Sequence, residues 1–171
     1  MKRLTVLRHA KAVPGEPGLD DFDRPLDDRG RSDARAIGCE LQRRGAVFDQ
    51  VLASPARRVR ETLDALAAGH GGPLDIAFDE RLYLAPAASL LDRVRAIPRD
   101  VESLLLVGHN PGLQQLLVEL GRDEPRGLRS RIAQAYPTAA LAIVEFEGRD
   151  WAGVAAASGE LVELILPREL D

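Results

Sequence analysis

The sequence predicts an α/β fold, a three-layer α/β/α sandwich around a mixed, mainly parallel central sheet. Apolar stretches of strand length alternate with stretches of helical periodicity along most of the chain, a pattern typical of layered α/β domains. The 171 residues correspond to about one domain of average size, so we expect a single domain over residues 1–171. Hydrophobic residues make up 45% of the chain and charged residues 29%, which excludes a disordered chain and supplies enough apolar side chains for a core.

Residues 4–7 form a short apolar run typical of a buried strand, with which the predicted elements begin. Residues 8–24 follow as a polar segment rich in Pro, Gly and Asp, without periodicity. So long a loop is a candidate wall of an active site. Asp27 or Asp28 is placed to cap a helix that ends before Gly45 and buries Ala34, Ile37, Gly38 and Leu41.

Residues 50–53 predict a second strand, which leads directly into the next helix. Ser54 and Pro55 are residue types that favour the N-cap and first helical positions. The helix that they begin is expected to stop at Gly69 and to face inward with Val59, Leu63 and Leu66. A weakly alternating run at residues 74–78 is a candidate edge strand.

Residues 103–107 predict the central strand, with a helix before it and another after it. The preceding helix ends at Pro98 and its apolar positions are Leu90, Leu91, Val94 and Ile97. The following helix has Asn110 as its cap and Pro111 at its first position, ends at Gly121, and buries Leu113, Leu116, Leu117 and Leu120.

The last part of the sequence predicts a loop followed by three strands. The loop carries four arginines, expected as a solvated face that could also help dock an acidic protein substrate: Arg122, Arg126, Arg129 and Arg131. Residues 141–146 and 151–156 predict two strands joined by a hairpin connection at residues 147–150. Residues 161–166 predict a final strand.

Charge and cysteine content exclude several classes of partner. The 23 Lys and Arg residues against 27 Asp and Glu residues give a net charge of −4, so there is no general basic field to hold a nucleic acid. Cys39 is the single cysteine and has no internal disulfide partner. No apolar run approaches the ~20 residues of a membrane span, and the apolar run after residues 1–3 is too short for a signal peptide. We therefore expect a soluble, cytoplasmic protein that binds neither nucleic acid nor membrane.

Two histidines occupy equivalent places at the ends of predicted strands. His9 follows the strand at residues 4–7, and His109 follows the strand at residues 103–107. In open α/β sheets, ligands bind beyond the carboxyl ends of the strands, so the two imidazoles are expected to converge on one crevice.

Arginines accompany these histidines and indicate a phosphate ligand. Arg8 precedes His9, and Arg57 and Arg58 fall in the first turn of the helix after the second strand. Cations at a helix N-terminus oppose the macrodipole, which suggests that an anion binds there. One residue of that turn is expected to point along the strand axis, and we assign Arg58 to this role with Arg57 as the alternative.

A histidine between arginines is suited to phosphoryl transfer without a metal. The guanidinium fork donates two parallel hydrogen bonds to phosphoryl oxygens and remains charged at any working pH. Like-charge repulsion lowers the pKa of a neighbouring imidazole, which keeps His9 neutral and its lone pair available for attack on phosphorus.

Three motifs in order resemble the histidine phosphatase superfamily, the relatives of phosphoglycerate mutase: Leu7-Arg8-His9-Ala10, Ser54-Pro55-Ala56-Arg57-Arg58 with Glu61-Thr62 behind it, and Gly108-His109-Asn110-Pro111. The short chain, the arginine in Asp23-Arg24-Pro25-Leu26 and the His-Asn-Pro turn are most similar to SixA-type phosphohistidine phosphatases. The resemblance implies a phosphoglycerate mutase-like fold and a phosphoenzyme mechanism. It implies His9 as nucleophile, Arg8, Arg58 and Arg24 as the phosphoryl clamp, and His109 as a further hydrogen-bond donor. We expect Asn110 and Ser54 to be helix caps first and phosphate contacts second. A surface ion pair with the neighbouring aspartates is the alternative for Arg24.

The sequence departs from the family in two places. Ala10 stands where the family has glycine, which requires that this position not need a positive φ. Mutase-like members carry an acidic glutamate shortly after an Arg-Leu pair, whereas here Arg81-Leu82 is followed by Tyr83-Leu84. Glu80 and Asp79 lie just upstream and are the candidates for a general acid. Without a dedicated acid, a phosphoramidate substrate such as phosphohistidine on a signalling or phosphotransfer protein is favoured over a phosphate monoester.

Other chemistries match the sequence less well. A cysteine phosphatase needs arginine six positions after its cysteine, where this chain has Gly45. Asp21-Phe22-Asp23 lies in a polar loop and not directly after a buried strand, where an aspartyl phosphatase needs it. The histidines lack metal-ligand spacing and no nucleotide-binding glycine motif occurs, so we expect neither metal nor cofactor. Two alternatives stay open: a phosphatase of a small phosphorylated metabolite, and a non-catalytic phosphate-binding or scaffold module.

Overall fold

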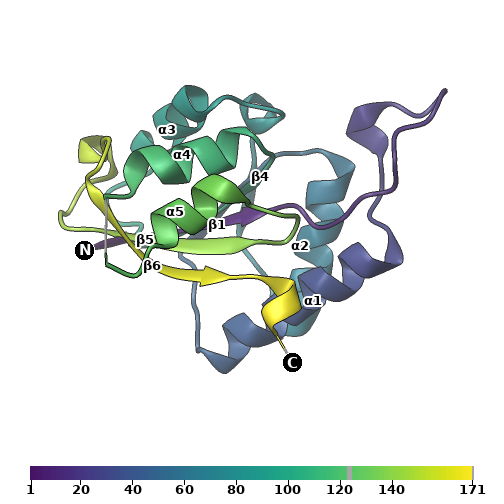
Figure 1. The fold of residues 1–171 in the computed structure, drawn as a ribbon, viewed down its shortest axis with the longest axis horizontal. Coiled ribbons are helices and arrows are strands. Elements are labelled where there is room, and N and C mark those ends of the chain that lie inside the picture. Colours follow the sequence, from purple (N-terminus) through teal and green to yellow (C-terminus); the bar gives the residue numbers. More distant parts are fainter. Residues whose placement is uncertain (123–124, 171) are drawn as a thin grey trace.

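The computed structural model describes residues 1–122 and 125–170, which form a six-stranded sheet with helices on both faces (Figure 1). The strand order is β3-β2-β4-β1-β5-β6. The strands are β1 (Lys2–Arg8), β2 (Gln50–Ala53), β3 (Ile76–Phe78), β4 (Ser103–Gly108), β5 (Leu141–Phe146) and β6 (Gly159–Ile165). The first four in this order are parallel, whereas β5 is antiparallel to both β1 and β6. The mixed, mainly parallel sandwich predicted from the sequence is confirmed.

Helices cover the two faces of the sheet in separate groups. The helices are α1 (Asp28–Arg43), α2 (Arg57–His70), α3 (Ala87–Arg95), α4 (Gly112–Leu120) and α5 (Leu128–Gln134). Helices α1 and α2 pack on one face, and α3, α4 and α5 pack on the other, each group over its own hydrophobic core (Figure 1). Strand β4 lies between β2 and β1 and contributes leucines to both cores, as its continuous apolar run predicts.

Helices α1 and α2 approach each other through glycines. A Cβ added at Gly38 would lie 2.1 Å from the carbonyl oxygen of Leu66, and one added at Gly69 would lie 2.2 Å from that of Arg35. The predicted end of α2 at Gly69 is therefore wrong. Gly69 serves this close packing inside the helix, and Gly71, with φ +87°, ends it.

The N-termini of two helices differ from their predicted caps. Helix α2 begins at Arg57 with Ala56 as its cap. The Ser54 hydroxyl, which also faces His109 as described below, accepts from the Ala56 N–H (3.3 Å) just before the helix. Helix α4 begins at Gly112, with Pro111 at the cap position. The side chain of Asn110 still accepts a hydrogen bond from the Gln114 N–H (3.2 Å). In contrast, Asp27 caps α1 as predicted and accepts from the Gly30 N–H at 2.7 Å.

Two predictions for the C-terminal third are wrong. The expected arginine-rich loop contains α5, which buries Leu128 and Ile132. Only these two apolar side chains, four residues apart, mark that helix in the sequence. Residues 151–156 are not a strand: Trp151–Gly153 form a 3-10 turn, in which Trp151 is fully buried and donates to the Val101 carbonyl (2.7 Å). Strand β6 therefore takes the place beside β5 that this segment was expected to occupy.

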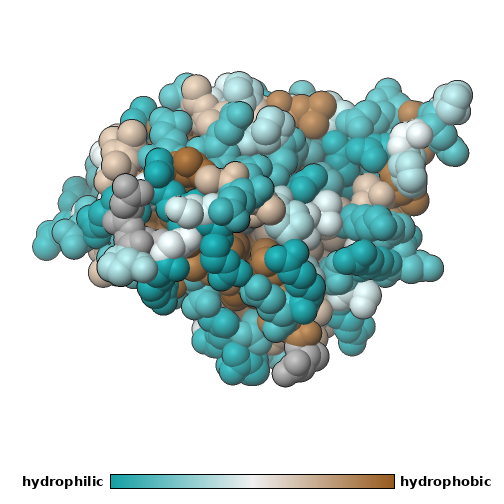
Figure 2. Space-filling model, in the orientation of Figure 1, coloured by the Kyte–Doolittle hydropathy of each residue, from teal (hydrophilic) through white to brown (hydrophobic). Residues whose placement is uncertain are grey.

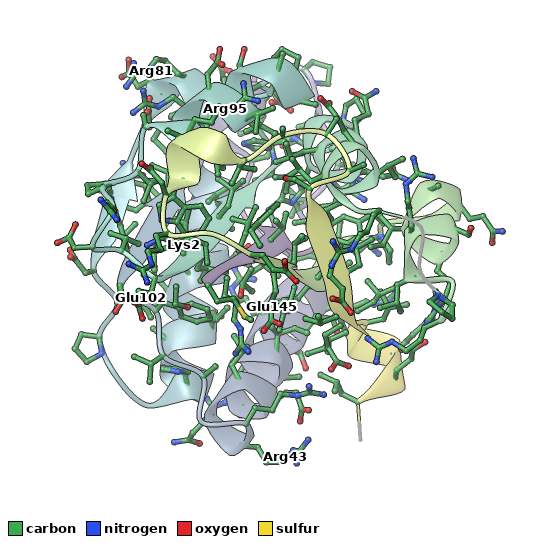
Figure 3. The ribbon with its side chains drawn as sticks, turned by 90° about the vertical axis from the view of Figure 1, so that its left-hand side faces the viewer. Lys2, Arg43, Arg81, Arg95, Glu102 and Glu145 are labelled. Carbon is green, nitrogen blue, oxygen red and sulfur yellow. The ribbon has the colours of Figure 1, made fainter. Side chains whose placement is uncertain are left out.

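Lys2 is the first residue of β1 and is labelled in Figure 3. Lys2 is 3% exposed, and its ammonium group donates to the carbonyls of Arg99 and Val101.

The face of the molecule in Figure 2 is mostly hydrophilic, with apolar residues in small separate patches. Within the described ranges, no helix has both the length and the apolar character that crossing a bilayer requires.

Candidate active site

The two histidines singled out in the sequence meet at the carboxyl edge of the sheet. Strands β1 and β4 are parallel neighbours, and their register pairs Arg8 with Gly108. His9 and His109 therefore leave the sheet at the same level, and their ring centroids lie 5.3 Å apart. This neighbourhood follows from the parallel pairing, as expected for ligand sites in open α/β sheets.

A cavity of about 330 Å³ surrounds these two rings. Six of the seven predicted site residues line it, Ser54 being the exception. The lining residues are Arg8, His9, Lys11, Ala12, Asp21, Arg24, Arg58, Leu84, His109, Asn110 and Thr138. A wider surface groove of about 630 Å³ lies beside α1, but its lining contains no histidine and is dominated by the ion pairs of Glu40 with Arg43 and Arg44. The smaller cavity is therefore the candidate active site.

His9 is held as a neutral imidazole with a defined proton position. Its ring is 8% exposed, and Nδ1 lies 2.7 Å from the Ala10 carbonyl oxygen. Because a carbonyl only accepts, Nδ1 carries the proton and Nε2 keeps its lone pair. Burial is the largest of the effects that lower the pKa of His9 to about 4, and the positive charge of Arg58 contributes to the same shift.

The backbone beyond the nucleophile candidate is anchored to α2. The Ala10 N–H donates to Thr62 Oγ1 (2.9 Å), and the Thr62 hydroxyl donates to the Arg58 carbonyl (2.6 Å). Both Ala10 and Thr62 are fully buried. Ala10 does not adopt a positive φ, so alanine is compatible with the position at which the family has glycine.

His109 lies opposite, between a hydroxyl and a guanidinium group. Its Nε2 is 2.7 Å from Ser54 Oγ, and its Nδ1 is 3.3 Å from Arg58 Nη2. Burial lowers the pKa of His109 to about 3, with further contributions from His9 and Arg58. Ser54 is fully buried behind this ring, so the structure gives its hydroxyl a role in orienting His109 and no place in the cavity lining.

Arg58 is the arginine of the α2 N-terminus that enters the cavity. It is 2% exposed, whereas the side chain of Arg57 is 56% exposed and pairs with Glu61. Arg58 Nη1 and Nη2 donate to the backbone oxygen (2.7 Å) and the Oδ2 atom (3.1 Å) of Asp21. Its Nε is buried and has no hydrogen-bond partner among the described residues.

Asp21 joins two of the three cavity arginines, Arg24 and Arg58, into one network. Its Oδ1 accepts from Arg24 Nε (3.0 Å), and its Oδ2 accepts from Arg58 and from the Tyr83 hydroxyl. The hydrogen bond from Tyr83 is the largest of the effects that lower the pKa of Asp21 to about 2. Arg24 therefore both lines the cavity and forms the ion pair with a neighbouring aspartate that was its alternative role.

Arg8 and Asn110 are positioned by a single backbone carbonyl. Arg8 Nη1 donates to the Tyr136 carbonyl oxygen (3.0 Å), and Asn110 Nδ2 donates to the same atom (2.8 Å). The ring of Tyr136 is buried, and its hydroxyl donates to the Val6 carbonyl (2.7 Å). Arg8 Nε, like that of Arg58, is buried without a hydrogen-bond partner in the described part of the chain.

The two carboxylates considered as general acids lie elsewhere. Asp79 and Glu80 line a separate cavity beside β3 and α3. Asp79 is paired with Arg81 (2.9 Å) and Arg93 (2.8 Å), and the hydrogen bond from Arg81 is the largest of the effects that lower the Asp79 pKa. Asp79 caps a 3-10 turn at Glu80–Leu82 that follows the edge strand β3, and both carboxylates line this other cavity. The expectation that either residue reaches the site is therefore not supported.

The sequence did not point to five residues of the lining, nor to Tyr83, which contacts both Asp21 and His109. The five are Lys11, Ala12, Asp21, Leu84 and Thr138. Asp21 lies in a loop with several aspartates, so no local pattern distinguishes it. The Tyr83 ring packs edge-on against His109, with centroids 5.4 Å apart. No group of three or more His, Cys, Asp or Glu side chains in residues 1–122 and 125–170 is arranged to hold a metal ion.

Comparison with known proteins identifies the family. Residues 4–83 match the model of the histidine phosphatase superfamily (branch 1). An uncharacterized protein of Mycobacterium tuberculosis (strain ATCC 25618 / H37Rv) is 33% identical over 166 residues, covering 95% of this chain and all of that protein.

Solved structures agree over nearly the whole chain. A structure described as "putative phosphohistidine phosphatase SixA from Agrobacterium tumefaciens" is 30% identical with a TM-score of 0.80, covering 97% of this chain and 98% of that chain. The SixA structure from Nakamurella multipartitia is 29% identical with a TM-score of 0.83, covering 97% and 96%. The chain therefore belongs to the histidine phosphatase superfamily, and it is a phosphatase with the SixA-type fold.

Proposed function

We propose that this protein hydrolyses a phosphoryl group carried on nitrogen, phosphohistidine in a signalling or phosphotransfer protein, through a covalent intermediate on His9. The observation that carries the proposal is the state of His9. Its Nδ1 proton is committed to the Ala10 carbonyl (2.7 Å), and a pKa of about 4 keeps the ring neutral. The Nε2 lone pair is thus available near pH 7 without a base to deprotonate it.

The phosphoryl group binds to the arginines of the cavity. Arg8, Arg24 and Arg58 supply three positive charges and Asp21 removes one, leaving +2 around two neutral histidines. That charge matches a phosphoryl dianion. Lys11 also lines the cavity, but its ammonium group pairs with Asp27 (3.8 Å). The Nε groups of Arg8 and Arg58 are buried donors without partners in the described structure, and such groups cost free energy until an acceptor reaches them. Phosphoryl oxygens are suitable acceptors.

The reaction then proceeds in two displacements at phosphorus. Nε2 of His9 attacks in line, the bond from phosphorus to the substrate nitrogen breaks, and its electron pair leaves with the imidazole of the substrate. Water next attacks the phosphorus of phospho-His9, which releases inorganic phosphate and restores the neutral ring. The guanidinium groups stabilise the equatorial oxygens in both steps. His109 lines the opposite wall, where its Nδ1 lies 3.3 Å from Arg58 Nη2 and helps to position that guanidinium group.

The nature of the leaving group follows from the missing acid. Asp21 is the only carboxylate among the described residues that line the cavity. With a pKa of about 2 it is ionised at neutral pH and carries no proton to donate. An alkoxide leaving group needs such a proton. An imidazole whose second nitrogen is already protonated leaves as a neutral molecule, so the site favours phosphohistidine. The structures from Nakamurella multipartitia and Agrobacterium tumefaciens are both described as a "putative phosphohistidine phosphatase", which agrees with this substrate.

The proposal is tested with a histidine-phosphotransfer domain that has been phosphorylated by phosphoramidate. Purified protein in EDTA should release inorganic phosphate from this domain faster than from β-glycerophosphate. Quenching the reaction should also yield a phosphorylated form of the protein whose phosphoryl group is labile to acid and stable to base. The His9→Ala variant should lose both, whereas His70→Ala, which alters the histidine outside the cavity, should keep them.

Two results would contradict the proposal in different ways. A preference for β-glycerophosphate over the phosphorylated domain would replace it with a small-molecule phosphomonoesterase. No phosphoenzyme and no turnover in the parent protein, with phosphate still bound, would indicate a non-catalytic phosphate-binding module.

A further inference from the structure

Leu84 is an apolar side chain at the mouth of a polar cavity. It is 56% exposed and lines the cavity together with His9, His109 and the arginines. Four large hydrophobic side chains of the described residues are exposed, namely Met1, Val47, Phe78 and Leu84. Among them, Leu84 alone lines this cavity. An exposed apolar residue needs no explanation elsewhere on a surface, but its place beside the proposed nucleophile gives it chemical meaning.

The backbone of Leu84 is held in a conformation that leucine disfavours. Its φ is +51°, in the left-handed region that is costly for residues with a branched side chain. Residues close to Leu84 in the chain are buried and hydrogen-bonded to each other. Leu82 is 1% exposed and Ala85 is 7% exposed, and the Ala85 N–H donates to the Leu82 carbonyl (3.3 Å).

The following residue is locked against α4. The Ala85 carbonyl oxygen lies so close to Gly112 that a Cβ added there would meet it at 2.0 Å. Gly112 begins α4, directly after the turn that carries His109. A strained residue that its surroundings hold in place beside a functional site is a known sign of a functional constraint. Here the constraint presents a leucine side chain where glycine would be easier to accommodate.

The burial gradient of the cavity places the leaving group near this side chain. Arg58 is 2% exposed and His9 is 8% exposed, whereas Leu84 is at the open rim. In-line attack puts the leaving atom opposite the attacking nitrogen. With the phosphoryl group among the buried arginines, the leaving group therefore extends from the interior toward the rim.

We infer that Leu84 determines specificity by packing against the ring of the leaving group, so that the site favours a phosphoryl group on an aromatic ring nitrogen. The inference rests on the proposed function. An imidazole offers two flat faces that a leucine side chain desolvates favourably. The same side chain offers no hydrogen bond to a sugar hydroxyl or a carboxylate, which lose solvent there without replacement.

Two small substrates separate ring recognition from phosphoryl transfer. Phosphoimidazole and phosphoramidate both have a phosphorus–nitrogen bond, but only the first has a ring on the leaving side. Leu84→Ala should lower kcat/KM about tenfold for phosphoimidazole, equivalent to about 1.4 kcal/mol, and leave it within about twofold for phosphoramidate. Val47→Ala, at a residue that is 74% exposed and away from the cavity, should change neither.

A second variant separates recognition from folding. Leu84→Gly removes the side chain and the backbone strain together, so it should lose the same selectivity while its Tm stays equal or rises. If both Leu84 variants keep the wild-type ratio of the two substrates, or lower both activities equally, the role of Leu84 is refuted while the proposed phosphatase function stands. If the parent protein turns over neither substrate, the proposed function itself fails and the inference with it.

Discussion

Acidification from pH 7 to pH 5 should destabilise the folded protein by about 4 kcal/mol through His9 and His109 alone. Their pKa values in the folded state are about 4 and about 3, because burial in the cavity disfavours the charged imidazole and the arginines add like-charge repulsion. In the unfolded chain both histidines titrate near a pKa of about 6.5. Below pH 6.5 the unfolded state binds protons that the folded state does not bind, so the free energy of unfolding decreases as the pH is lowered.

The size of the stability loss follows from the difference between the folded-state and unfolded-state pKa values of each histidine. Each histidine contributes about 1.36 kcal/mol per pH unit while only its unfolded form is protonated. From pH 6.5 to pH 5 that is about 2 kcal/mol for each ring, and the loss continues for each until its folded pKa is reached. Asp21 and Glu40, with pKa values of about 2, stay ionised across this window and do not obscure the effect.

Urea unfolding at pH 7 and pH 5, in buffer free of phosphate, measures this difference directly. The His9→Gln variant removes one of the two titrations, so its loss of stability should shrink to about 2 kcal/mol. Inorganic phosphate should reduce the loss in the parent protein, because a bound dianion favours the protonated rings. A decrease below about 1 kcal/mol, or NMR titration of the His9 ring near pH 6.5, would refute the view that burial keeps the nucleophile neutral.

Three further predictions concern the network and the packing behind the site. Asp21→Asn should lower the inhibition constant of inorganic phosphate about fivefold, because the carboxylate that competes with phosphate for Arg58 is lost. The Asp21 side chain is 46% exposed, so its ion pair with Arg58 contributes only about 1 kcal/mol. An unchanged or higher constant would argue that Asp21 mainly positions the arginine. Thr62→Val should cost about 1–3 kcal/mol in urea unfolding, because the buried Ala10 N–H loses its acceptor, whereas Thr62→Ser should retain most of the stability; equal losses would contradict this account. Gly38→Ala should cost about 1–3 kcal/mol, since its Cβ would lie 2.1 Å from a carbonyl oxygen of α2, and a Tm at or above that of the parent would contradict it.

The positions of the two histidines could be predicted from the sequence because they depend on local patterns. Continuous apolar runs mark β1 and β4, since strands covered by helices on both faces bury side chains on both sides of the sheet. Their parallel pairing then follows from the alternation of strands and helices. A histidine after each strand was thus enough to place both rings at one edge of the sheet.

Local patterns left an alternative open, or failed, where no periodic signal distinguishes one residue from its neighbours. Arg57 and Arg58 are the same residue type in adjacent positions. Only the rotation of α2 about its axis, set by its packing on the sheet, buries Arg58 and exposes Arg57. Helix α5 has a short apolar pattern among arginines, too weak to separate from a loop. The segment at residues 151–156 has strand-like composition, but the burial of Trp151 turns it away from β5.

By itself, then, the sequence determined the fold class, the main strands and the histidine pair with its arginines. These features depend on hydrophobic periodicity and on capping residues, which involve residues close together in the chain. Only the tertiary structure decided the chemistry around them. Asp21 lies 37 residues from Arg58 in the chain, Ser54 is 55 residues from the His109 ring that it orients, and Leu84 reaches the cavity from a third segment. Such contacts arise from how separate elements pack, and that packing is set by the whole core.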